Sequence, residues 1–393
     1  MSEISYLEKL LDGADVEWLS LGKILVRTKG TKITAGQMKV LHKDNAPLKI
    51  FAGGKTVAFV DYKDIPEKDI NRKPSIIVKS RGVIEFEFYD KPFSHKNEMW
   101  SYHSKNETIN IKYIYYFLKM NEAYFQKVGG KMQMPQISTP DTDKFRVPIP
   151  CPANPEKSLA IQSEIVRILD TFTELTAELT AELTAELSMR KKQYNYYRDQ
   201  LLSFDDVEVE WKTLGELAEN LDSKRKPITS GLREAGKIPY YGASGIVDYV
   251  KDYIFDGDFL LVSEDGANLL ARNTPIAFSI SGKTWVNNHA HVLKFDTYAE
   301  RRYVEYYLNS IDLTTYISGA AQPKLNKKNL ESIRIPNPSP EEKERIVSIL
   351  DKFDALTNSI TEGLPREIEL RQKQYAYYRD MLFSFPKQEV AEA

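Results

Sequence analysis

Two segments of the chain carry apolar residues at steps of three and four, which is the spacing of one face of an α-helix. These apolar positions are Ile165, Ile168, Phe172, Leu175, Leu179, Leu183 and Leu187 in the first segment, and Ile346, Ile349, Phe353, Leu356 and Ile360 in the second. Pro155 and Pro340 suit the helix starts, because a missing N–H costs nothing in the first turn. We expect two helices of about 45 residues, roughly 65–70 Å long, packed antiparallel along their apolar faces. Gly363 and Pro365 should kink or interrupt the second helix.

Outside these segments the pattern changes to short apolar and aromatic runs separated by glycine, proline and asparagine. Strands are predicted at 75–80, 84–88, 258–263 and 276–280. An aromatic helix is predicted near KYIYYFL (112–118) and another near RYVEYYL (302–308), with tyrosines that pack in a core. The pattern therefore predicts two α+β blocks whose sheets are mostly antiparallel.

The chain also repeats itself, and the repeat fixes its organisation. Residues 164–204 match residues 345–385 at a constant offset, most clearly in RKKQYNYYRDQLLSF and RQKQYAYYRDMLFSF. The aromatic helices correspond as well, FAGGKTVAFV (51–60) weakly matches YGASGIVDYV (241–250), and DVEWLSLGKI (15–24) matches EVEWKTLGEL (208–217). In the last match, the segment at the amino end corresponds to the segment that follows the first long helix. The repeat is therefore circular.

A circular repeat predicts two similar halves related by a pseudo-twofold axis, so that one chain imitates a symmetric dimer. The predicted segments are a block at 1–152, a helix at 153–204, a block at 205–338, a helix at 339–386 and a tail at 387–393. The expected fold is thus α+β, with two α/β domains separated by two long antiparallel helices that form a coiled coil.

Composition excludes several classes of protein. No run of 18 apolar residues exists among the 393, so no membrane span is expected, and the amino end lacks the pattern of an export signal. One cysteine, Cys151, excludes internal disulfides and indicates a reducing, cytoplasmic location. The net charge of -2 hides an uneven distribution, because residues 21–150 carry 23 basic and 13 acidic side chains. A block with a net charge of +10 could lie against phosphates, although a solvated lysine-rich surface would look the same.

Motifs for catalysis are missing. GLREAGKI (231–238) has the glycine and lysine spacing of a phosphate-binding loop, but Ile238 replaces the magnesium-binding Ser or Thr and Pro239 blocks the following helix. There is no dinucleotide-binding fingerprint, no Asn-Pro-Pro or Asp-Pro-Pro methyltransferase signature, and only a faint nuclease-like group at Pro140, Asp141 and Lys144. His289 and His291 could bind a metal from one strand face, but hydrogen bonding is the favoured role because no third ligand lies nearby.

Polar loop residues at the ends of predicted strands fit recognition of DNA bases and phosphates instead. The candidate DNA contacts are Lys55, Arg81, Lys96, Asn97, Lys131, Gln133, Ser244, Glu264, Asp265, Lys283, Asn287, Asn288, His289, His291, Gln322, Lys324 and Lys327. Several lie in GAAQPKLNKKN (319–329) and its counterpart GGKMQMPQIS (129–138). Each residue alone could be an ordinary solvated turn residue, but the clusters favour DNA.

The first long helix contains TAEL three times in succession, from Thr176 to Leu187. Each copy would change the helix length by about 6 Å while preserving helicity, so the repeat predicts a spacer. The spacer residues are Thr176, Leu179, Thr180, Leu183, Thr184 and Leu187.

With these TAEL copies, its YYRD segments and its circular repeat, the chain resembles the specificity subunit of type I restriction-modification systems, in the type IC-like subgroup whose spacer varies by TAEL copies. The resemblance implies two target recognition domains that each read one half of an asymmetric, bipartite site in double-stranded DNA. It implies two modification subunits that bind S-adenosylmethionine and methylate adenine, and restriction subunits that use ATP and Mg²⁺. No cofactor, metal or catalytic residue is expected in this chain. A free-standing restriction or methylation enzyme and a helical scaffold that binds only protein remain the alternatives.

Overall fold

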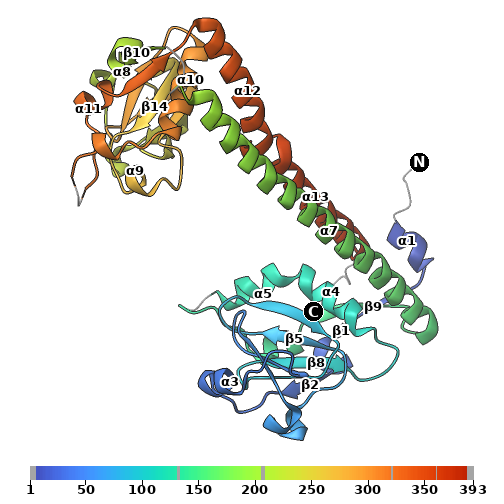
Figure 1. The fold of residues 1–393 in the computed structure, drawn as a ribbon. Helices are drawn as coiled ribbons and strands as arrows, with labels where there is room; N and C mark the ends of the chain where they lie inside the picture. Colours follow the sequence, from blue (N-terminus) through green and yellow to red (C-terminus); the bar gives the residue numbers. More distant parts are fainter. Residues whose placement is uncertain (1–5, 131–132, 205–208, 320–321, 360, 387–393) are drawn as a thin grey trace. The chain divides into compact units, whose positions relative to one another are not determined.

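The computed structural model describes residues 6–130, 133–204, 209–319, 322–359 and 361–386. It contains two compact units (Figure 1), the first formed by Met1–Ala181 with Glu369–Ala393 and the second by Glu182–Ile368. No helix among the described residues is long and apolar enough to cross a membrane.

The first unit is built on antiparallel sheet, as the sequence predicts. Its four-stranded sheet has the order β2-β8-β5-β6, and a three-stranded sheet has the order β4-β3-β7, in which β3 and β7 are parallel. The bounds of the strands in these two sheets are β2 Leu25–Lys29, β3 Leu48–Phe51, β4 Val57–Val60, β5 Ser75–Lys79, β6 Glu85–Tyr89, β7 Phe93–His95 and β8 Trp100–Ser104. A separate antiparallel pair joins β1 (Val16–Ser20) to β9 (Arg146–Pro150).

Helices of the first unit pack against these sheets and complete their cores. They are α1 Tyr6–Leu11, α2 Leu21–Ile24, α3 Ala35–Leu41, α4 Ile111–Met120, α5 Glu122–Gly129 and α6 Thr139–Asp143, with 3-10 turns at Tyr62–Asp64 and Glu67–Asp69. The predicted aromatic helix is α4, whose Tyr113, Ile114 and Phe117 are buried in one cluster with Ile76 and Val78 of β5. The core role predicted for these tyrosines is confirmed for Tyr113, whose hydroxyl donates to the Pro148 carbonyl at 2.8 Å.

The second unit repeats this plan with a larger sheet of order β11-β16-β14-β15-β12-β13, in which only the contact of β12 with β15 is parallel. The bounds of its strands are β10 Glu210–Thr213, β11 Glu219–Asn220, β12 Ala235–Gly242, β13 Gly245–Val250, β14 Phe255–Ser263, β15 Ala277–Val286, β16 Ala290–Lys294 and β17 Arg334–Asn337. Its shorter helices are α8 Leu214–Leu217, α9 Asn268–Ala271, α10 Tyr298–Ser310 and α11 Lys327–Glu331, with 3-10 turns at Asp222–Lys224, Ser230–Leu232 and Thr314–Tyr316. The predicted second aromatic helix is α10, and β10 pairs with β17 as β1 pairs with β9.

The long helices begin at the predicted prolines. α7 runs without interruption from Pro155 to Leu202, so it starts in the first unit and ends in the second. The other long segment is broken, as expected, into α12 (Pro340–Asn358) and α13 (Gly363–Leu382). Gly363 has a φ of +76°, and a Cβ there would lie 2.4 Å from the Ala355 carbonyl oxygen, so this turn requires glycine.

Within each unit the long helices pack antiparallel (Figure 1). In the first unit Phe172 of α7 meets Tyr378 of α13 at 5.5 Å between ring centroids, and Leu179 lines a groove with Arg371. In the second unit Tyr197 of α7 stacks on Phe353 of α12 at 5.7 Å.

The predicted apolar seam is only partly correct. Leu175 is 57% exposed, because a four-residue apolar step drifts around the helix and turns this leucine outward. Ile360 lies outside the described residues.

The circular repeat is confirmed by the core of the first unit. Phe383, which follows α13, packs on Tyr113 with ring centroids 5.4 Å apart, and the Trp18 Nε1 donates to the Pro386 carbonyl at 2.9 Å. At the end of α7, Leu202 and Phe204 pack in the same way into the core of the second unit. Each block is therefore completed by the end of a long helix.

Candidate nucleic-acid interface

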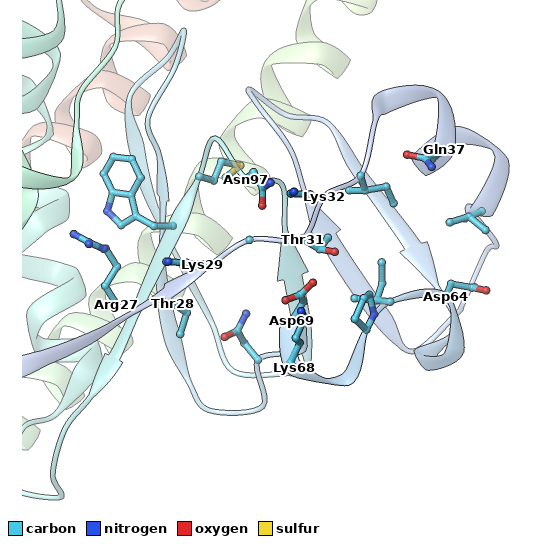
Figure 2. Close-up of a pocket in the computed structure, with 18 of the residues that line it drawn as sticks. Arg27, Thr28, Lys29, Thr31, Lys32, Gln37, Asp64, Lys68, Asp69 and Asn97 are labelled. Atoms are coloured by element: carbon cyan, nitrogen blue, oxygen red, sulfur yellow. The ribbon is translucent and has the colours of Figure 1, made fainter.

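A wide basic cleft of about 1140 Å³ opens in the first unit between the four-stranded sheet and the smaller sheet with α3 (Figure 2). Its polar lining comes from β2 and the following loop, from α3, from the 3-10 turns and the loop after them, from the loop after β7 and from the start of α6. These polar lining residues are Arg27, Thr28, Lys29, Thr31, Lys32, Gln37, Asp64, Lys68, Asp69, Asn71, Asn97 and Thr139. The cleft lies entirely within the segment of net charge +10.

Three lysines give this cleft its character. Lys29, Lys32 and Lys68 are exposed, whereas Arg27 forms an ion pair with Asp143 of α6. Flexible, exposed ammonium groups suit the phosphate oxygens of DNA, because a lysine can contact a phosphate without requiring one fixed hydrogen-bond geometry. The sequence shows the charge of this region but not these positions, because charge counts do not show which lysines line one hollow.

Close backbone approach fixes one wall of the cleft. A Cβ on Gly30 would lie 2.4 Å from the carbonyl oxygens of both His95 and Lys96, so only glycine fits there. With its amide nitrogen turned toward this loop, Asn97 donates to the Gly30 carbonyl at 2.7 Å and to the Thr31 carbonyl at 3.3 Å. Of the predicted DNA contacts that the structure describes, only Asn97 lines the cleft, and its amide holds the loop that carries Lys29 and Lys32.

The other predicted contacts of the first unit lie apart from the cleft lining. Lys55 is exposed in the turn between β3 and β4, Gln133 is exposed, and Arg81 donates to the Gln136 side chain at 2.9 Å. Lys96 pairs with Glu98 at 2.7 Å. Burial would raise the pKa of Glu98, but the hydrogen bond and charge of Lys96, a backbone hydrogen bond and the charge of Arg81 together lower it. Lys131 lies outside the described residues.

In the faintly nuclease-like group, Asp141 has a structural role. Its carboxylate accepts from the Ser138 backbone N–H and hydroxyl, both at 2.6 Å, which caps α6.

A buried ionic cluster occupies the corresponding part of the second unit. The Arg225 guanidinium lies 2.6 Å from Glu264 and 3.3 Å from Asp222, and Lys324 adds a contact of 3.0 Å to Glu264. Burial would raise the pKa of Glu264, but hydrogen bonds from Arg225 and Lys324 keep it below its usual value. The cluster joins the 3-10 turn at Asp222, the end of β14 and the loop before α11.

His291 completes the cluster. Its Nδ1 lies 2.6 Å from the Asp222 carboxylate and its Nε2 lies 2.7 Å from the Leu325 carbonyl oxygen. Both ring nitrogens therefore have partners within the unit. His289 instead pairs with Asp265 at 2.8 Å on the surface. Both histidines therefore have hydrogen-bonding roles.

Asp222, Glu264 and His291 are close enough to ligate one cation, since their ligand atoms lie within 4.8 Å of one another. The guanidinium of Arg225 already supplies positive charge to both carboxylates. Both ring nitrogens of His291 already have partners, the Asp222 carboxylate and the Leu325 carbonyl oxygen. The three residues are thus held by ion pairs and hydrogen bonds of the unit itself.

Burial divides the predicted contacts of the second unit into two groups. Glu264, Asn287 and His291 are 9%, 7% and 1% exposed, and this burial argues against the base contacts predicted for them. Sequence patterns missed this because strand register decides which polar side chain turns inward. The more accessible candidates are Ser244, Asp265, Lys283, Asn288, His289, Gln322, Lys324 and Lys327.

GLREAGKI does not form a phosphate-binding loop. The 3-10 turn Ser230–Leu232 leads into strand β12, which begins at Ala235, so no helix presents its amino end there.

The model of the type I restriction modification DNA specificity domain matches residues 32–189 and 206–370. The chain is 42% identical to the EcoR124I/EcoR124II type I restriction enzyme specificity subunit from Escherichia coli, over 99% of both chains. It is 37% identical to the EcoprrI specificity subunit from the same species, over 92% of this chain and 93% of the relative.

Solved structures show the same fold at low identity. The S subunit of a type I restriction-modification system from M. genitalium matches with a TM-score of 0.52 and 18% identity, over 96% of this chain and 98% of that one. A chain from a structural study of type I system assembly and conformational transition matches with a TM-score of 0.59 and 13% identity, over 94% and 97%.

Proposed function

Since this chain belongs to the type I restriction-modification DNA specificity family, whose members recognise DNA sequence, we propose that its two units each read one half of an asymmetric, bipartite site. The observation that carries this proposal is the basic cleft of the first unit, where Lys29, Lys32 and Lys68 line one hollow. Such a surface supplies the phosphate contacts that give DNA binding its affinity and register.

The two units share a plan but present different side chains. Lysines dominate the cleft of the first unit, whereas Asn288, His289 and Lys324 lie near the end of β14 in the second. Asparagine suits adenine, and lysine suits guanine or phosphate. Two unlike reading surfaces on one chain suit an asymmetric target that an exact homodimer could not read.

In this proposal α7 sets the spacing of the half-sites. It is one uninterrupted helix of 48 residues, and it contains all three TAEL copies. A rigid rod changes its length in steps of about 6 Å when one four-residue unit is lost or gained. Copy number would thus alter the gap and leave the bases of each half-site unchanged.

The long helices also dock the partner subunits in this proposal. Tyr196 and Tyr377 occupy equivalent places in the repeated YYRD segments and are 62% and 66% exposed. Two matching exposed aromatic positions suit two copies of one partner. We assign these to two modification subunits, which carry S-adenosylmethionine and methylate adenine; ATP and Mg²⁺ would act in restriction subunits.

A DNA-binding titration of the chain assembled with its modification partner tests this function. The proposal predicts salt-dependent, sequence-selective binding to one bipartite site by the assembly. Failure of the assembly to protect any unique bipartite sequence would overturn it. A methyl-transfer assay on the chain alone separates it from a free-standing methyltransferase, which would modify DNA without a partner.

A further inference from the structure

Both units fasten a polar loop to the end of a central strand in the same way. In the first unit the Ile137 N–H donates to the Ser80 carbonyl at 3.0 Å, just after β5, and the Gly82 N–H donates to the Pro135 carbonyl at 2.9 Å. In the second unit Leu325 donates to Glu264 at 2.8 Å, just after β14, and Gly266 donates to Pro323 at 3.2 Å. Gly82 and Gly266 both have positive φ, so the strand ends turn alike.

The bases of the two loops also match. The Gln136 N–H donates to the Gly129 carbonyl at 3.1 Å, and the Lys324 N–H donates to the Ser318 carbonyl at 2.8 Å. Each loop ends in a buried apolar residue, Ile137 or Leu325, which anchors it in its own unit. The fastening is therefore a repeated device.

Side chains around the two loops differ, with one exception. The residues that pair across the fastening are Arg81 and Gln136 in one unit but Asp265 and Lys324 in the other. Each loop nevertheless carries a glutamine between its closing contacts, Gln133 and Gln322, and both are exposed. An exposed side chain is not needed for packing, so a glutamine shared by otherwise different loops points to something that both half-sites have in common.

We propose that Gln133 and Gln322 bind the target adenine that each half-site contains, before that base is extruded for methylation. This inference rests on the proposed function. A glutamine amide can donate to adenine N7 and accept from adenine N6–H₂ in the major groove. Thr139, two residues after Ile137, lines the cleft that carries the three lysines, so the first loop ends beside this cleft. A lysine-lined surface favours DNA over protein as the partner of this loop.

The test is a double-mutant cycle that combines a protein substitution with a base replacement, in the complex assembled with its modification subunits. Q133A and Q322A are each titrated with the DNA site carrying adenine or 7-deazaadenine at each of the two target positions, since the deaza base lacks the N7 acceptor. The wild-type complex should lose about 5- to 100-fold in affinity at either position. Q133A should be insensitive to the replacement at one position only, and Q322A at the other only.

Each variant carries its own control, because its response at the other half-site must remain that of the wild type. If the affinity losses from a glutamine variant and from the deaza base multiply at both target positions, the inference is overturned. It is also overturned if a variant recognises different bases in its half-site. A fall in bound modification subunits, measured by native mass spectrometry, would show a protein contact and equally overturn it. If the wild-type complex binds no bipartite site at all, the proposed function has failed. This outcome differs from multiplying affinity losses, which overturn only the role of the glutamines.

Discussion

The Tyr116 hydroxyl of α4 donates to the carboxylate of Asp170 on α7 at 2.5 Å. The same contact joins α10 to α12 in the second unit, where Tyr306 donates to Asp351 at 2.6 Å. Burial raises the pKa of both tyrosines, and the adjacent carboxylates raise it further, so each phenol remains a donor. Two contacts at matching places in the repeat show that each block is attached to a long helix by the same chemistry.

Removing the Phe383 side chain should destabilise the first unit selectively. Phe383 is 4% exposed and packs on Tyr113 and Phe117, so Phe383→Ala would cost about 3–5 kcal/mol. Hydrogen exchange should show lost protection in β5 and α4, with β14 and α10 unchanged. The matched control is Leu202→Ala, which should weaken the second unit instead. Equal loss in both units for either variant would contradict the circular arrangement.

Neutralising the cleft lysines should weaken DNA binding without changing the recognised bases. Lys29→Ala, Lys32→Ala and Lys68→Ala should each lower the affinity of the assembled complex. Each should also reduce the slope of log K against log salt by about 0.9, if the lysine neutralises one phosphate. Lys9→Ala, an exposed lysine of α1 outside the cleft, serves as the control. Unchanged salt slopes for all three would place the DNA elsewhere.

Acidification should loosen the ionic cluster of the second unit. Burial alone would raise the pKa of Asp222 and of Glu264, but hydrogen bonds from His291 to Asp222 and from Arg225 to Glu264 keep both below their usual values. Because the folded pKa values are depressed, this stabilisation is complete above about pH 5 and is lost as the pH falls through them.

We therefore predict that the Tm of the second unit falls between about pH 5 and pH 3, and that Glu264→Gln, which cannot titrate, shows a shallower fall. Thermal unfolding followed over this pH range gives the comparison. The same slope for the variant and the wild type would show that Glu264 does not contribute.

Much of the fold follows from local sequence. Pro155 and Pro340 begin the long helices, and Gly363 marks the break between α12 and α13, because each residue acts through its own backbone. The exposure of Leu175 was not predicted, because it depends on how a four-residue repeat drifts relative to the partner helix.

The candidate interface was less predictable. Asn288 and Gln322 were expected in exposed loops and lie there, but His291 and Asn287 are buried. The sequence shows that these residues are polar, while the pairing of distant segments decides their exposure: His291 contacts Asp222 and Leu325, far away in the chain. Lys29, Lys32 and Lys68 form one surface for the same reason.

We propose that α7 sets the gap between the two half-sites that the units read. The most direct measurement is a methylation map of DNA from cells carrying the full system, with the natural chain and with one TAEL unit deleted. The map should show one asymmetric bipartite motif. The deletion should keep both half-sites and shorten the gap by about one to two base pairs, because about 6 Å of helix corresponds to at most two steps of 3.4 Å. An unchanged gap, or a map without a bipartite motif, would contradict the claim.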